Sequence, residues 1–184
     1  MMPLDTPLFL FGHSMGGAEV LHYAATHPNP YIRGYIAESP FIALDPQTRP
    51  AAITVTAGRM ACRVLPNFQM KQPLNRDFLT RDHESNMKIA ADPLCHDTGT
   101  LEGLRGMLDR AEELETCKVR VDEGKSIWIG HGTDDRICAY DATKTWFDKC
   151  CGIKDRTFRS YNGWYHRSKL CATLTALHLS LIHI

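Results

Sequence analysis

Two short apolar runs and one mixed run along the chain have the lengths and bounding turn residues that are typical of strands. They are PLFLF at residues 7–11, IWI at residues 127–129 and TFRSY at residues 157–161, the last followed by Asn162 and Gly163. After the first run, Ala18, Leu21 and Ala25 recur at helical spacing within residues 15–27. The pattern predicts a strand that leads directly into a helix near the start of the chain, and two further strands near its end.

Two other stretches show helical periodicity. Residues 100–115 predict a surface helix of the body, because Leu101, Leu104, Leu108 and Ala111 share one face and charges occupy the other. Residues 53–68 predict an amphipathic helix with Arg59 and Arg63 on its polar side, ended by Pro66. Its apolar face comprises Ile53, Ala57, Met60, Ala61, Val64, Leu65 and Phe68. Two interpretations of that face stay open: it leans on a lipid surface, or it packs on the body of the domain.

The composition is that of one globular domain or part of one, with 184 residues, 43% of them hydrophobic and 23% charged. Lys and Arg number 21 and Asp and Glu number 21, so the formal net charge is +0 and polyanionic partners such as nucleic acid are not expected. The N-terminus lacks the basic stretch of a signal peptide, and nowhere are there about 18 consecutive apolar residues for a membrane span.

The number and spacing of the cysteines favour a reducing compartment. They are odd in number and lack the paired CxxC spacing of a zinc site, so we expect reduced thiols in an intracellular protein. The seven positions are Cys62, Cys95, Cys117, Cys138, Cys150, Cys151 and Cys171.

The sequence GHSMG at residues 12–16 matches the pattern GxSxG at the junction between the predicted strand and helix. In this context the pattern indicates a nucleophile elbow, a strained turn that exposes the Ser14 hydroxyl near the N-terminus of a helix. We expect both Gly12 and Gly16 to be required sterically, because side chains there would collide across the turn. The alternative is a glycine-rich turn in which Ser14 merely caps the helix.

A nucleophilic serine needs a histidine base and a carboxylate that orients it, and in this fold they follow in the order serine, acid, histidine. Asp134 and Asp135 come directly after the strand at 127–129, and His166 follows the turn at residues 162–163. We favour Asp135 as the acid, with Asp134 as a loop or helix-capping carboxylate.

His166 is favoured as the base, because it combines a loop after a strand with a position after the acid. His131 is expected to line the site without chemistry, and His13 to point into the packed side of the elbow. Four further histidines are interpreted as solvated or helix-capping side chains: His22, His27, His83 and His96.

Several motifs in a fixed order, from about Pro3 to about His166, resemble the monoacylglycerol lipase family and look closest to its fungal members. They are PLFLFGHSMGGAEVL, LPNF, FLTRD, ADPL, HGTDDRIC and YNGWYH. The resemblance implies a partial α/β-hydrolase fold: a mostly parallel sheet with flanking helices and an inserted helical cap, or lid. It also implies hydrolysis of monoacylglycerol through an acyl-enzyme, with Ser14 as nucleophile, Asp135 as acid and His166 as base. The backbone N–H of Met15 would help to bind the oxyanion, and no metal or organic cofactor would be required.

Residues 15–134 separate the serine from the acid, which is more than one strand and one helix need, so we expect a cap insertion at about 45–95 within a domain spanning 1–166. By the resemblance, Phe41, Ile137 and Cys138 fall where the family lines its acyl tunnel, although Cys138 can also be a plain buried cysteine. Val64 and Leu65 of the cap are further substrate-binding candidates. The expected location is cytoplasmic, with the cap in peripheral contact with a membrane or lipid droplet.

The two ends of the chain depart from the family. Eleven residues precede Gly12, so we expect a truncated domain with an unpaired apolar edge on its first strand and a missing oxyanion donor. We therefore expect insoluble expression and weak or absent activity. Residues 167–184 form an atypical tail that does not continue the family pattern. Two alternative functions stay open: another lidded esterase or lysophospholipase, or a catalytically inert hydrolase-like module.

Overall fold

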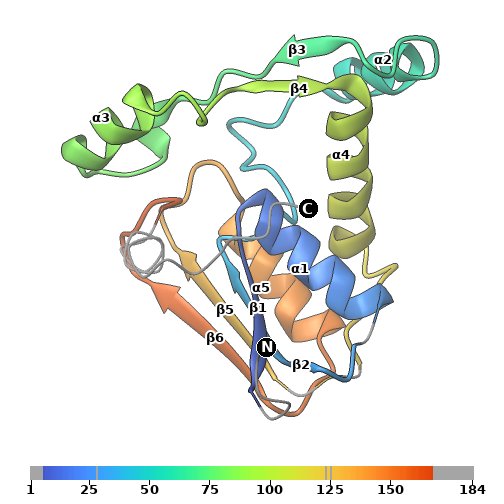
Figure 1. Ribbon diagram of the computed structural model, residues 1–184, viewed down its shortest axis with the longest axis vertical. Coiled ribbons are helices and arrows are strands. Elements are labelled where there is room, and N and C mark those ends of the chain that lie inside the picture. Colours follow the sequence, from blue (N-terminus) through green and yellow to red (C-terminus); the bar gives the residue numbers. More distant parts are fainter. Residues whose placement is uncertain (1–5, 28, 123, 125, 168–184) are drawn as a thin grey trace.

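Four parallel strands form the central sheet in the order β1-β2-β5-β6 (Figure 1). They are β1 (Leu8–His13), β2 (Ile32–Glu38), β5 (Ile127–Gly132) and β6 (Arg156–Tyr161). The computed structural model describes residues 6–27, 29–122, 124 and 126–167. The strands predicted at 7–11, 127–129 and 157–161 coincide with β1, β5 and β6, and the parallel sheet confirms the predicted α/β class.

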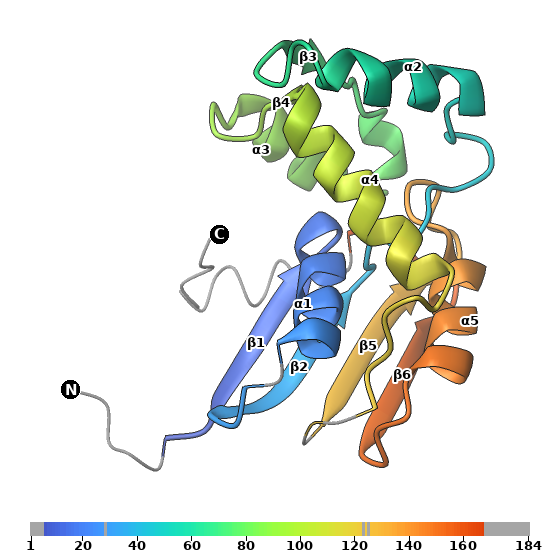
Figure 2. The same cartoon turned by 90° about the vertical axis from the view of Figure 1, so that its right-hand side faces the viewer.

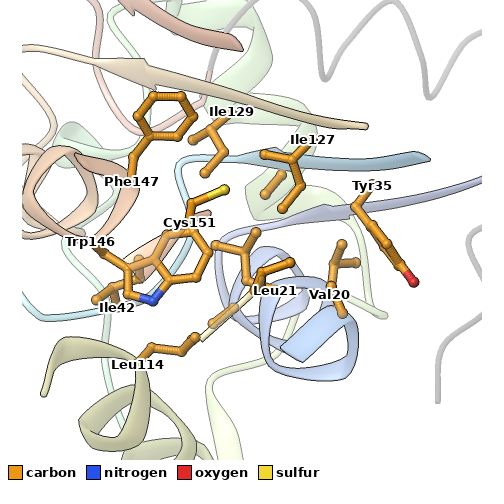
Figure 3. Packing of buried hydrophobic residues seen from close by; sticks show 14 of the residues in the cluster. Val20, Leu21, Tyr35, Ile42, Leu114, Ile127, Ile129, Trp146, Phe147 and Cys151 are labelled. Carbon is orange, nitrogen blue, oxygen red and sulfur yellow. The ribbon is translucent and has the colours of Figure 1, made fainter. Parts of the chain in front are cut away.

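Three helices cover one face of this sheet: α1 (Met15–Thr26), α4 (Leu101–Glu115) and α5 (Tyr140–Cys150) (Figure 2). The core lies between them and the strands, where Leu21, Leu114, Ile129 and Trp146 are 0 to 1% exposed (Figure 3). Side chains of a strand alternate between the two faces, so Ile36 and Trp128 point away from this core and are only partly buried. The helices predicted at 15–27 and 100–115 are α1 and α4.

A cap follows β2 and lies beyond the carboxyl ends of the strands (Figure 1). It contains helix α2 (Ala52–Cys62), the 3-10 helix η1 (Arg76–Phe78), helix α3 (His83–Ala91) and an antiparallel pair of short strands, β3 (Gln69–Lys71) and β4 (Thr98–Thr100). The chain returns to the body directly from β4 into α4. Asn75, Asp82 and Thr100 cap η1, α3 and α4 respectively, each through a side-chain oxygen that accepts a backbone N–H.

The apolar face predicted on residues 53–68 is exposed to solvent, so the interpretation that it packs on the body is wrong for the described residues. The helix ends at Cys62, four residues before Pro66. Arg59, on the opposite side, binds α4 through Asp109 at 2.8 Å and Glu112 at 2.5 Å. The largest exposed side chains of the segment are Ile53, Met60, Val64, Leu65 and Phe68, which are 55 to 79% exposed.

Two of the cysteines form a disulfide, so the expectation of reduced thiols is wrong for this pair. Cys117 follows α4 and Cys150 ends α5, and their Cα atoms lie 5.6 Å apart. The bond links the ends of two helices that pack on the same face of the sheet. The free cysteines among the described residues are Cys62, Cys95, Cys138 and Cys151.

Strand β1 forms one edge of the four-stranded sheet as the structure describes it, and its Leu8 and Phe9 are 45% and 49% exposed. An apolar edge of this kind can pair with another chain, so insoluble expression stays a prediction. Within the described ranges, no helix has both the length and the apolar composition that crossing a bilayer requires. The atypical tail from residue 168 onward lies outside the described residues.

Candidate active site

Ser14 occupies the turn between β1 and α1 with φ 56° and ψ −118°. A non-glycine residue with positive φ is uncommon and costs on the order of 1–3 kcal/mol, so such strain marks a candidate functional position. The turn is fixed by the Ser14 N–H, which donates to Glu38 O at 2.9 Å, and by Ser14 O, which accepts from Phe41 N at 2.9 Å. The side chain of Ser14 makes no capping hydrogen bond to α1, so the helix-cap alternative is wrong.

The two glycines of the pattern do not have the same role. A Cβ atom on Gly12 would lie 2.1 Å from the carbonyl oxygen of Gly16, so no other residue fits there without moving the backbone. A Cβ atom on Gly16 would meet nothing within 4 Å among the described residues. The prediction of a steric requirement is confirmed for Gly12 and wrong for Gly16.

This difference gives a matched pair of variants. Gly12→Ala is expected to lower the free energy of unfolding by about 3 kcal/mol or more, because the clash is with backbone atoms and cannot be relieved by a rotamer change. Gly16→Ala lies inside α1, where alanine is favoured over glycine by roughly 1 kcal/mol, so no loss is expected. Urea unfolding followed by circular dichroism measures both, and equal losses would contradict the assignment.

Asp135 lies just beyond the end of β5 and is 4% exposed. Its Oδ1 accepts from the N–H groups of Ile137 at 2.8 Å and Cys138 at 3.0 Å. Its Oδ2 lies 2.8 Å from His166 Nδ1 and 3.1 Å from His131 Nε2. Burial raises the pKa of Asp135, but the hydrogen bonds and charges of the two imidazoles outweigh it and hold the pKa well below its ordinary value. The carboxylate is therefore ionised at neutral pH.

His166 follows β6 and is 2% exposed. Because its Nδ1 donates to Asp135, the lone pair of the neutral ring lies on Nε2, which is the arrangement that a general base requires. The backbone carbonyl of His166 accepts from His13 Nε2 at 3.1 Å. Burial, followed by the charge of the neighbouring His166, lowers the pKa of His13 to about 3, so this ring is neutral and acts as a fixed donor.

Cys138 is a buried thiol whose pKa depends on both Ser14 and Asp135. Burial and the Asp135 carboxylate raise the pKa of that thiol well above its usual range, against the hydrogen bond from Ser14 that lowers it. Among the described residues no hydrogen bond joins the Ser14 hydroxyl to His166. The link between the two runs through the residue before Ser14: the centre of the His13 ring lies 4.8 Å from the centre of the His166 ring. Catalytic hydrogen bonds are often long without substrate and tighten in the complex, so a Ser14–His166 bond belongs to the proposal below.

His131 contacts Asp135, although the sequence predicted only that it lines the site. It is fully buried, and its Nε2 lies within hydrogen-bond distance of both Asp135 Oδ2 and, at 3.2 Å, the carbonyl of Cys138. The sequence feature that could have indicated this contact is the position of His131 near the end of a strand, four residues before Asp135. His131 gives Asp135 a second imidazole partner and helps to hold the carboxylate ionised.

Asp134 differs from Asp135 in its surroundings. Its side chain is 44% exposed and forms an ion pair with Arg81 of the cap at 3.0 Å. Its N–H donates to Trp164 O at 3.0 Å. This bond joins the loop after β5 that carries Asp135 (residues 133–139, called the acid loop) to the loop after β6 that carries His166 (residues 162–167, called the base loop). Of the two aspartates, Asp135 is the one that lies against an imidazole.

The other candidate residues fall into two groups. Phe41 and Ile137 are 5% exposed and Cys138 is fully buried, all beside the serine or the acid. Val64 and Leu65 are 79% and 55% exposed on the cap, and Met15 is 48% exposed at the start of α1. Their roles in binding substrate or oxyanion stay predictions. In the part of the chain that the structure describes, no group of three or more His, Cys, Asp or Glu side chains is placed to hold a metal ion.

Comparison with known proteins gives a consistent result. The model of the family described as "Serine aminopeptidase, S33" matches residues 3–168. A Schizosaccharomyces pombe protein named "Putative monoglyceride lipase" is 34% identical over 164 residues, which are 88% of this chain and 42% of that protein. The monoglyceride lipase of Saccharomyces cerevisiae is 28% identical over 168 residues, 87% of this chain and 53% of that protein.

The solved structures agree. The monoacylglycerol lipase of Paleococcus ferrophilus has a TM-score of 0.79 at 25% identity, covering 95% of this chain and 67% of that chain. A soluble variant of the Saccharomyces cerevisiae enzyme in complex with a substrate analog has a TM-score of 0.79 at 24% identity, covering 94% and 60%. The chain spans about half or less of the length of the two yeast proteins named above.

Proposed function

Because the chain belongs to the serine aminopeptidase S33 family and has an α/β-hydrolase fold, we propose that it is a serine ester hydrolase that cleaves monoacylglycerol to glycerol and a free fatty acid. The observation that supports the proposal is the 2.8 Å contact of His166 Nδ1 with a buried, ionised Asp135, together with a strained Ser14 whose preceding residue, His13, contacts His166. The substrate class follows the names of the relatives, which are 34% and 28% identical.

Each group has a defined part in the proposed reaction. His166 Nε2 takes the proton of Ser14 as its Oγ attacks the ester carbonyl, and Asp135 stabilises the imidazolium that forms. The oxyanion lies against the N–H of Met15 at the N-terminus of α1, and glycerol leaves after it takes the proton from His166. Water, activated by the same imidazole, then releases the fatty acid from Ser14.

The apolar character of two core residues that bond to Ser14 and Asp135 through their backbone is consistent with a lipid ester as the proposed substrate. Phe41 and Ile137 come from different loops that meet next to Ser14 and Asp135. An acyl chain gains free energy when it leaves water for an apolar site, at about 0.8 kcal/mol per buried CH₂ group. Positioning of the substrate by these side chains is part of the proposal.

The test compares two lipid esters under the same conditions. The chain is expected to hydrolyse monoacylglycerol in mixed micelles at a rate at least about tenfold above its rate on a lysophospholipid of the same acyl chain, which corresponds to about 1.4 kcal/mol of discrimination. Ser14→Ala serves as the inactive control. Equal rates would favour a broader lidded esterase, and no hydrolysis of either ester would support an inert hydrolase-like module.

The exposed apolar face of the cap is proposed to contact a lipid surface, from which the substrate would enter. Val64→Ser combined with Leu65→Ser is expected to weaken co-sedimentation with phosphatidylcholine vesicles by about tenfold or more, since full burial of such a side chain contributes roughly 1.5–3 kcal/mol. Tyr31→Ser is the matched control, because Tyr31 is 82% exposed at the start of β2, at the opposite end of the sheet. Unchanged binding of the double variant would remove the membrane role.

A further inference from the structure

One short segment of the cap lies against both loops that carry the proposed acid and base. It comprises residues 78–81, which run from the last residue of η1 toward the start of α3, and is called the clamp segment below. Asn86 of α3 donates from Nδ2 to Thr80 O at 3.1 Å, so the segment is attached to the cap helix. Phe78 and Leu79 are partly buried against the hydrophobic core, and Arg81 extends over the loops.

The clamp segment contacts the acid loop on both sides of Asp135. The Arg81 guanidinium donates to Asp134 Oδ2 at 3.0 Å. The Arg136 guanidinium lies 5.6 Å from the centre of the Phe78 ring. Asp134 and Arg136 are the residues immediately before and after Asp135, whose own side chain is buried.

The same segment contacts the base loop on both sides of His166. The Arg81 guanidinium lies 4.3 Å above the centre of the Tyr165 ring. The N–H of Arg167 donates to Leu79 O at 2.7 Å. Tyr165 and Arg167 are the residues immediately before and after His166, so all four neighbours of the acid and the base touch the clamp segment.

We propose that the clamp segment holds the acid loop and the base loop in register, and that Arg81 is a positioning residue for ester hydrolysis through its simultaneous contacts with Asp134 and Tyr165. This inference rests on the proposed function. It adds that the position of the cap is coupled to the geometry of the catalytic groups. Movement of the cap away from the body would break the Arg81 contacts with both loops together.

Arginine suits this position for a physical reason. Its planar guanidinium can donate to a carboxylate with one edge while its face stacks on an aromatic ring, and the point charge of lysine cannot do both in the same way. The ion pair is largely exposed, with Arg81 60% and Asp134 44% exposed, and such pairs contribute little to overall stability. The effect of its loss is therefore expected in the local geometry of the loops and not in the folding equilibrium.

The test combines hydrogen exchange with kinetics in four single variants of the 184-residue chain and in the double variant Arg81→Met with Asp134→Asn. Arg81→Met and Asp134→Asn remove the ion pair from either side, and Arg81→Lys keeps the charge without the planar stack. Arg76→Met is the matched control, because Arg76 lies five residues earlier and makes no ion pair among the described residues. The measured quantities are exchange rates of the amides of Ile137, Cys138 and Arg167, and kcat and KM for a short-chain soluble ester.

Arg81→Met is expected to accelerate exchange in both loops and to lower kcat about tenfold at unchanged KM, since small displacements of catalytic groups cost up to about 10² in rate. Asp134→Asn should have a similar effect on the acid loop, and the double variant should add nothing further. Arg81→Lys is expected to keep the acid loop protected while the Arg167 amide exchanges faster. The melting temperature of every variant should stay that of the unaltered chain.

Three results would overturn the inference: unchanged exchange in both loops of Arg81→Met, faster exchange with unchanged kcat, or the same effects in Arg76→Met. Reaction of the unaltered chain with a fluorophosphonate separates this inference from the proposed function. If that reaction fails, ester hydrolysis is excluded and no positioning role in it remains. The exchange comparison still decides whether the clamp segment holds the two loops.

Discussion

Replacement of His166 by alanine is expected to lower kcat for ester hydrolysis by on the order of 10⁶, because among the described residues neither of the other two imidazoles of the site is available to take the proton from Ser14. His13 contacts His166 but is held neutral and donates to a backbone carbonyl. His131 is fully buried and its Nε2 faces Asp135. The residual rate would come from oxyanion stabilisation and substrate binding alone.

The control for this variant is His22→Ala. His22 lies on α1 and bonds Glu113 of α4 at 2.9 Å, so it shares the body but not the site. The rate of ester hydrolysis of His22→Ala should equal that of the unaltered chain. Initial rates with a short-chain chromogenic ester measure both variants, and a loss below about tenfold in His166→Ala would be incompatible with a general base at this position.

Asp135→Asn is expected to lower kcat by about 10⁴, the second-largest effect. The amide is close to isosteric, so the N–H groups of Ile137 and Cys138 can still donate to Oδ1. The change removes the negative charge that fixes the tautomer of His166 and stabilises its protonated form. The predicted loss is therefore electrostatic and leaves the surrounding backbone in place.

Asp134→Asn separates the two neighbouring carboxylates. Because Asp134 pairs with Arg81 and not with an imidazole, this variant should lose only about tenfold in kcat, through the positions of the loops. Rates are compared at saturating ester and neutral pH. Equal losses in Asp134→Asn and Asp135→Asn would rule out Asp135 as the acid that orients His166.

The parts of this molecule that depend on local sequence were predictable. The strand-to-helix junction at Ser14 follows from an apolar run, a glycine at position 12 and a helical period, all within 15 residues. Asp135 follows β5 and His166 follows β6 in the sequence. Because the carboxyl ends of parallel strands lie at one edge of the sheet, the two side chains are expected to lie close together. These rules place the candidate catalytic residues at the carboxyl edge of the sheet without any knowledge of side-chain packing.

The remaining features depend on packing, which periodicity does not report. The segment at 53–68 shows which residues share a face, but only the structure shows that Arg59, opposite that face, is the contact with α4. Gly16 matched a motif although its Cβ position is open. The disulfide joins Cys117 to Cys150 across 33 residues, and the contacts of Arg81 with Asp134 and Tyr165 join residues even further apart in sequence.

The proposed function requires that the Ser14 hydroxyl is activated as a nucleophile. The most direct measurement is mass spectrometry of the chain after reaction with a fluorophosphonate. A single adduct is expected on Ser14, in the peptide that spans β1 and α1, and it should be lost in Ser14→Ala and His166→Ala. An unmodified Ser14 in the intact chain, or an adduct that persists in Ser14→Ala, would contradict the proposed function.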